Sequence, residues 1–148
     1  MKLALGCDHA GYDLMQQVKE HLKKRGVEFE DFGTYSTESC HYPVFAEKAC
    51  RAVVEGKCDR GILICGTGVG ISIAANKVHG IRASLCNDLF TARLTRQHND
   101  ANVLCMGGRV IGVEVALDIV DIWLDTQYLN SGNHPARLKL IEEIEKRG

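Results

Sequence analysis

The sequence has no long apolar run, no block of like charge and no repeated segment, and each absence excludes a class of protein. No apolar run among the 148 residues approaches the length of a membrane span, and the first residues lack the pattern of a secretory signal peptide. The formal net charge is −1, without a lysine or arginine block, so the footprint of a nucleic-acid-binding protein is absent. Lacking also a linker, the chain is expected to form a single domain over residues 1–148.

Paired cysteine motifs are absent as well. The chain has seven cysteines, an odd number, and no two of them have Cys-x-x-Cys spacing. This pattern fits neither a disulfide framework nor a zinc knuckle. Free thiols are typical of a reducing compartment, and we therefore expect a cytoplasmic protein.

What is present is a regular alternation of strand-like and helix-like patterns. Strands are expected at residues 2–7, 27–32, 62–65, 81–85 and 102–106. Helices are expected over about 12–25, 43–55, 71–77, 88–98, 112–128 and 135–146, the fourth of them with Asn87 as its N-cap. The alternation predicts an α/β fold, a parallel sheet with helices on both faces. Ligands of such sheets bind outside the carboxyl ends of the strands.

The central strand runs directly into a glycine-rich turn, Cys65-Gly66-Thr67-Gly68-Val69-Gly70. Glycine at alternate positions permits a sharp turn and close approach to a ligand, and the helix that follows begins with unpaired N–H groups. The spacing matches neither a phosphate-binding P-loop nor a dinucleotide fingerprint. The structural alternative is a tight strand-to-helix turn in which the glycines serve packing alone. With a thiol beside it, the turn is better interpreted as a backbone cradle for an anion.

Cys65 is the candidate reactive group, because a helix start favours a thiolate. It could act as a nucleophile or as a general base. Tyrosine-phosphatase chemistry is excluded, since it needs an arginine six residues further on, where Ile71 stands. Asp8 and His9 follow the first strand and reach the same rim, where they could hold a sugar hydroxyl or could be a helix cap and a surface histidine.

Taken together, these segments resemble the B-type ribose-5-phosphate isomerases, which form one superfamily with the galactose-6-phosphate isomerase subunits. The resemblance covers nearly the whole chain and is most specific in the turn Cys65–Ile71 and in Arg96-Gln97-His98-Asn99-Asp100. Gly6-Cys7-Asp8-His9-Ala10-Gly11 also matches. The resemblance implies a Rossmann-like three-layer αβα fold with a five-stranded parallel sheet. It further implies that the protein is an aldose–ketose isomerase of the pentose phosphate pathway. It also implies a homodimer or tetramer whose active sites are shared between subunits, with residues 112–148 at the interface, and no metal or organic cofactor.

The resemblance also implies roles for individual residues. Cys65 resembles the base that moves a proton between C1 and C2 of the sugar, assisted by Thr67, and His98 resembles the residue that opens the furanose ring. The resemblance implies that N–H groups of the turn, at Gly66, Gly68, Val69 and Gly70, stabilise the enediolate. It implies that Asp8, His9 and Asn99 hold the sugar hydroxyls. It also implies that Arg109 and Arg137 bind the phosphate.

One position departs from the family pattern. Members commonly carry Gly-Gly-Arg-His before the last helix, whereas this chain reads Gly132-Asn133-His134 after an apparent one-residue insertion. A charge-assisted hydrogen bond is worth about 1.5–3 kcal/mol, so losing the arginine could weaken phosphate binding about tenfold or more unless His134 compensates. Asn133 keeps one alternative open, an isomerase of a six-carbon or unphosphorylated sugar. A non-catalytic sugar-phosphate-binding protein is a further, less favoured alternative, because a binding protein needs none of Cys65, Thr67 and His98.

Overall fold

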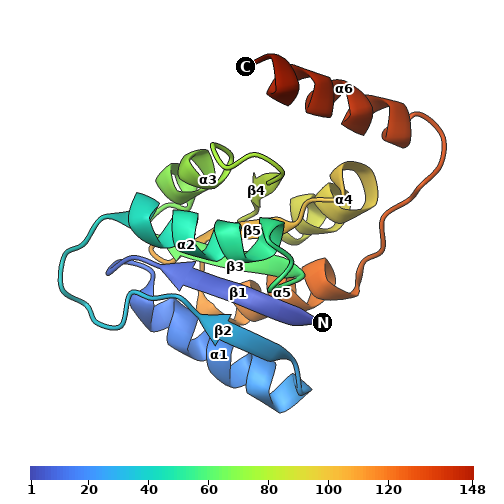
Figure 1. Ribbon diagram of the computed structural model, residues 1–148. Helices are drawn as coiled ribbons and strands as arrows, with labels where there is room; N and C mark the ends of the chain where they lie inside the picture. The colour runs from blue at the N-terminus through green and yellow to red at the C-terminus, as the bar shows by residue number, and fades with distance from the viewer.

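The computed structural model describes residues 1–148 and confirms the predicted three layers (Figure 1). The five strands are β1 (Lys2–Cys7), β2 (Glu28–Asp31), β3 (Arg60–Cys65), β4 (Ala83–Leu85) and β5 (Val103–Gly107). All pair in parallel, in the order β2-β1-β3-β5-β4, so β3 lies at the centre of the sheet. No helix is long and apolar enough to cross a membrane.

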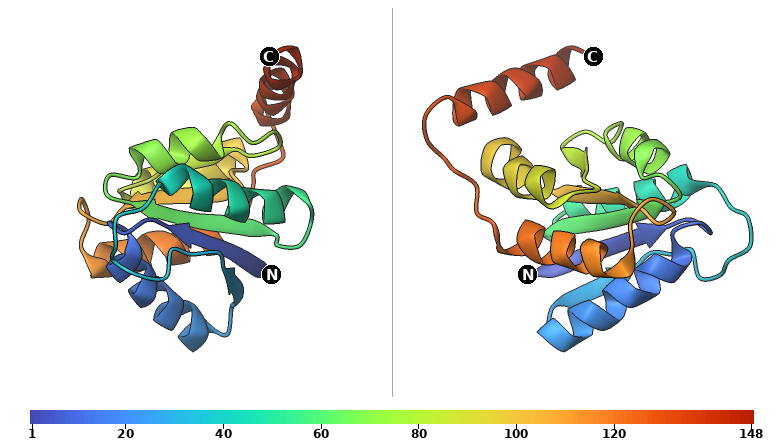
Figure 2. Two further views of the ribbon diagram at one scale, coloured as in Figure 1. Left: turned by 60° about the vertical axis from the view of Figure 1, so that its left-hand side comes forward. Right: turned by 180° about the vertical axis from the view of Figure 1, so that it is seen from behind.

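Six helices complete the fold, and five of them pack on the sheet. They are α1 (Tyr12–Arg25), α2 (Tyr42–Val54), α3 (Val69–Ala75), α4 (Leu89–Asn99), α5 (Val113–Asp125) and α6 (His134–Arg147). The core of one sheet face is built with α1 and α5, and that of the other with α2 and α3 (Figure 2). The helix α6 stands apart from these layers, at the end of a long connection from α5.

Alternation along the strands explains the two cores. Ile62 and Ile64 of β3 enter the core with α1 and α5, whereas Leu63 and Cys65 enter the core with α2 and α3. All four are buried, as expected for a strand covered on both faces. The alternation therefore brings Cys65, the last residue of β3, to the carboxyl edge on the α2–α3 side.

Several helix ends differ from the sequence-based prediction; α3, for example, spans Val69–Ala75 and not 71–77. Two further differences concern α4 and α5. The N-cap of α4 is Asp88 and not Asn87, because the Asp88 side chain accepts a hydrogen bond from the Thr91 N–H at 2.7 Å. The helix α5 ends at Asp125, three residues before the expected end at 128, because Thr126 adopts an extended backbone conformation. The side chain of Asn87 is consequently free for contacts outside the helix.

The apolar side of α5 packs on its own sheet. Val120, Trp123 and Leu124, which could have formed a subunit interface, are buried in the core with α1, and Leu117 packs against them. These residues therefore cover the sheet of their own chain. Three of the exposed large apolar side chains lie on α6, where Leu140, Ile141 and Ile144 are 58%, 45% and 61% exposed.

Candidate active site

The thiol of Cys65 lies at the centre of the carboxyl edge and is held by the turn that follows it. Cys65 is 4% exposed, and its Sγ accepts a hydrogen bond from the Gly68 N–H at 3.1 Å. Gly68 has a φ of 81°, and a Cβ at this position would lie 2.4 Å from Leu85 Cδ1. Only glycine fits this conformation, so the turn is built to direct an N–H group at the sulfur.

Other N–H groups of the turn point to no acceptor within the chain. Those of Gly66, Thr67 and Gly70 make no hydrogen bond, whereas the Val69 N–H donates to Thr67 Oγ1 at 3.1 Å. Gly68 and Val69, two of the predicted donors, use their N–H groups inside the turn. The N–H groups of Gly66, Thr67 and Gly70 can donate to an oxyanion next to the thiol.

The end of β5 fixes this turn from the neighbouring strand. Gly108 N–H donates to the carbonyl of Cys65 at 2.8 Å, and Arg109 N–H donates to the carbonyl of Gly66 at 2.9 Å. The side chain of Arg109 returns along the turn, because a Cβ on Gly66 would lie 3.6 Å from its Nη1. The guanidinium forms no ion pair within the chain, so a positive charge lies beside the turn.

Asp8 and His9 reach the same edge from the end of β1. Asp8 Oδ1 accepts the N–H groups of Ala10 and Gly11, both at 3.0 Å, so one carboxylate oxygen has a structural role in the turn. Its Oδ2 accepts no hydrogen bond within the chain. His9 Nδ1 accepts the Cys40 N–H at 3.2 Å, which in a neutral ring leaves the proton on Nε2. Asp8 thus retains an acceptor and His9 a donor.

A second group of predicted residues lies on α4 and α6. The rings of His98 and His134 are stacked, with centroids 4.5 Å apart and planes inclined by 14°. Arg137 follows His134 by one turn of α6. The loop before α6 is tied to α4 by a hydrogen bond from Leu129 N–H to the carbonyl of Gln97 at 3.0 Å. The ring stack therefore joins the two helices at a defined place.

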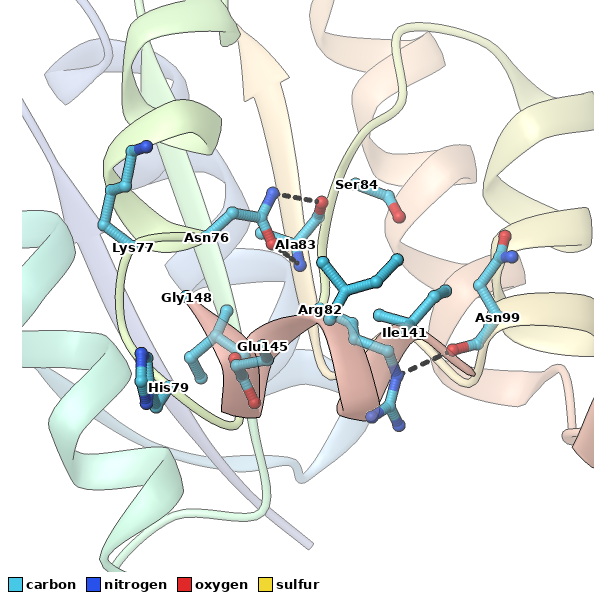
Figure 3. Close-up of a pocket in the computed structure, with 12 residues that line it drawn as sticks. Asn76, Lys77, His79, Arg82, Ala83, Ser84, Asn99, Ile141, Glu145 and Gly148 are labelled. Atoms are coloured by element: carbon cyan, nitrogen blue, oxygen red, sulfur yellow. Dashed lines mark hydrogen bonds between the residues drawn. The ribbon is translucent and has the colours of Figure 1, made fainter. Parts of the chain in front are cut away.

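Asn99 follows His98 and lines the largest cavity of the chain, of about 480 Å³. Figure 3 shows the cavity between α6, with Ile141 and Glu145, and the segment that carries Arg82. Arg82 Nε donates to the carbonyl of Asn99 at 2.9 Å. Cys65 lines none of the four cavities. The predicted site residues thus form two groups, one around Cys65 and one on α4 and α6, and no cavity of the chain joins them.

One residue at the edge escaped the sequence-based prediction. Asn87 follows β4 and contacts both the turn and β5, whereas we expected it to cap α4. Its position just after a strand could have indicated this role, because the carboxyl ends of all strands of a parallel sheet meet at the same edge. No cluster of three or more His, Cys, Asp or Glu side chains is arranged to hold a metal ion.

Comparison with known proteins gives consistent matches over nearly the whole chain. Residues 3–141 match the family model described as Ribose/Galactose Isomerase. Ribose-5-phosphate isomerase B of Escherichia coli K12 is 53% identical, and the match covers 99% of this chain and 97% of that protein. A galactose-6-phosphate isomerase subunit of Clostridium acetobutylicum is 40% identical over 97% of this chain and 83% of that protein. The solved Clostridium thermocellum ribose-5-phosphate isomerase B superposes with a TM-score of 0.97, at 54% identity and 99% coverage of both chains.

Proposed function

The chain belongs to the ribose/galactose isomerase family, and from that premise we propose that it interconverts ribose 5-phosphate and ribulose 5-phosphate. The observation that carries the proposal is Cys65, a thiol that accepts a backbone N–H and lies beside three N–H groups without acceptors. A base next to preorganised donors is what proton transfer α to a carbonyl requires.

In the proposed reaction Cys65 acts as the thiolate. It removes the proton from C2 of the open-chain aldose, and the electron pair of that C–H bond moves to form the enediolate. The N–H groups of Gly66, Thr67 and Gly70 donate to the oxygen that becomes negative. The Thr67 hydroxyl moves a proton between the two enediolate oxygens, and the Cys65 thiol returns its proton to C1. This gives the ketose with no net gain or loss of protons.

Ring opening and binding use the other predicted residues. His98 transfers the proton that opens the furanose, while Asp8 Oδ2, His9 Nε2 and Asn99 hold the sugar hydroxyls. Arg109 and Arg137 bind the phosphate as charge-assisted donors. His134 supplements them where Asn133 lacks a charge. The stack of His98 on His134 supports this arrangement, because it holds a ring-opening group next to a phosphate ligand.

We further propose that a homodimer completes each site. Cys65 and His98 belong to separate groups of one chain, and no cavity of that chain joins the two groups. The exposed apolar residues of α6 need a partner surface, and a second copy that covers them would carry the His98 group of one chain to the Cys65 group of the other. The seven free thiols fit a cytoplasmic, reducing location.

Asn133 favours a second candidate, an isomerase of a six-carbon or unphosphorylated sugar. An assay with ribose 5-phosphate, allose 6-phosphate, ribose and allose separates the two. The proposed function predicts a kcat/KM for ribose 5-phosphate well above the other three and no turnover by Cys65→Ala. A higher value for a hexose would establish the second candidate, and no turnover of any sugar by the wild type would overturn both.

A further inference from the structure

The side chain of Asn87 bridges the glycine-rich turn and the neighbouring strand. Its Oδ1 accepts the Gly107 N–H at 2.9 Å, and its Nδ2 donates to the carbonyl of Thr67 at 3.5 Å. Gly107 is the last residue of β5 and is the register partner of Cys65 in β3. The firm bond to Gly107 fixes which way the amide faces, so the NH₂ group is directed at the turn.

The Thr67 carbonyl belongs to the peptide unit that serves Cys65. In the Thr67–Gly68 unit the C=O group faces Asn87, and the N–H group of Gly68 donates to Cys65 Sγ at 3.1 Å. The C=O and N–H groups of a trans peptide point in opposite directions and move together. Any rotation of this unit that released the carbonyl from Asn87 would also turn the N–H group away from the sulfur.

Steric contacts hold the same peptide unit against β5. A Cβ at Gly107 would lie 2.6 Å from the carbonyl oxygen of Thr67, and a Cβ at Gly68 would lie 2.8 Å from the carbonyl carbon of Met106. Packing thus limits how far the unit can translate, but a peptide plane can still rotate within such a space. Asn87 provides the hydrogen bond that selects its orientation.

We propose that Asn87 is a positioning residue for the reaction, which orients the Thr67–Gly68 peptide so that the Gly68 N–H stabilises the thiolate of Cys65. Asn87 does not touch the reacting atoms. Its effect is on the charged form of the thiol, because a hydrogen bond to a charged group favours that form. The inference rests on the proposed role of Cys65 as a base.

Two variants separate the contacts of Asn87. Asn87→Ala removes both hydrogen bonds. Asn87→Asp keeps the acceptor for Gly107 in a side chain of the same shape but replaces the NH₂ group by an oxygen, which repels the Thr67 carbonyl and adds negative charge near the sulfur. Asn87→Asp should therefore impair the thiolate at least as much as Asn87→Ala, although it perturbs packing less.

Asn102 supplies the matched control. Its side chain also bridges two backbone groups, accepting the Arg82 N–H at 2.8 Å and donating to the Gly80 carbonyl at 2.9 Å. It precedes β5 and so lies at the opposite edge of the sheet from Cys65. Asn102→Ala therefore loses a bridging amide, as Asn87→Ala does, but leaves the glycine-rich turn unchanged.

The test measures kcat/KM for ribose 5-phosphate against pH, and the alkylation rate of Cys65 by iodoacetamide against pH, resolved by peptide mass spectrometry. A lost hydrogen bond of about 0.5–1.5 kcal/mol corresponds to a shift of roughly 0.4–1.1 pH units. For both Asn87 variants we expect the acidic limbs of both profiles to shift to higher pH by that amount. The kcat should be reduced and the KM nearly unchanged.

Profiles of the Asn87 variants that coincide with those of Asn102→Ala would overturn the proposal, as would a loss confined to KM. The alkylation readout does not depend on the substrate. If the wild type failed to turn over ribose 5-phosphate while the alkylation profile still shifted, the proposed substrate would be wrong and the role of Asn87 would stand. Normal turnover without a shift in alkylation would reject the role of Asn87 alone.

Discussion

The rings of His98 and His134 stack with their centroids 4.5 Å apart, although the two residues come from different helices. The stack connects α4, which packs on the sheet, with α6, which stands apart from it (Figure 2). It thereby holds a ring-opening candidate and a phosphate-binding candidate at a fixed separation, as a substrate with a reactive end and a charged end requires.

Replacement of His98 should affect the cyclic substrate most. His98→Ala should lower kcat/KM for ribose 5-phosphate, which is mainly a closed ring, by about 10²–10⁴-fold, the usual contribution of a general acid–base. Erythrose 4-phosphate cannot form the same furanose ring, so its turnover should fall much less. The ratio of the two losses is the measurement. His134→Phe, which keeps a stacked ring but removes a proposed phosphate donor, is the control and should affect both sugar phosphates alike. Equal losses for both sugars in His98→Ala would reject a role in ring opening.

Mixed dimers should reveal whether a site is shared. Cys65→Ala alone is expected to be inactive, and His98→Ala alone is expected to keep about 1% of the wild-type activity or less. If each site takes Cys65 from one chain and His98 from the other, a mixed dimer has one intact site and one doubly defective site. Random reassociation of equal amounts should then restore about a quarter of the wild-type activity. A mixture as inactive as its parents, with exchange verified by mass spectrometry, would contradict the shared site.

An arginine at position 133 should strengthen phosphate binding. Asn133 precedes α6 and its side chain makes no capping hydrogen bond, so Asn133→Arg loses no capping hydrogen bond of the helix. A new charge-assisted hydrogen bond of about 1.5–3 kcal/mol would lower KM for ribose 5-phosphate by roughly tenfold or more. Unphosphorylated ribose should show no change and serves as the control. An unchanged KM for the phosphorylated sugar would show that residue 133 does not reach the phosphate.

Thiol alkylation should select few of the seven cysteines. Burial raises the pKa of Cys7 and of Cys50 to about 12 and that of Cys86 to about 11, and burial also raises the pKa of Cys105 well above its usual value. At pH 8 these four are thiols and should remain unmodified by iodoacetamide in the folded protein. Modification of Cys65 should abolish activity, and ribose 5-phosphate should protect it. Inactivation that tracks one of the four buried thiols would contradict this assignment.

The sequence predicted the alternation of elements, the parallel sheet and the place of Cys65, because apolar periodicity and glycine spacing are local signals. It did not predict the role of Asn87. An asparagine and an aspartate next to each other before a helix can both act as N-cap, and the choice of Asp88 depends on side-chain geometry. Nor could it predict the stack of His98 on His134, since that contact depends on the path of the connection between α5 and α6.

The most direct test of the central claim is deuterium exchange at C2 of ribose 5-phosphate, followed by NMR in D₂O with wild type and Cys65→Ser. The account predicts that the wild type incorporates solvent deuterium at C2 as it isomerises. Cys65→Ser should lose both isomerisation and exchange while melting at nearly the same temperature as the wild type. Exchange at C2 that persists at the wild-type rate in Cys65→Ser would contradict the assignment of Cys65 as the base.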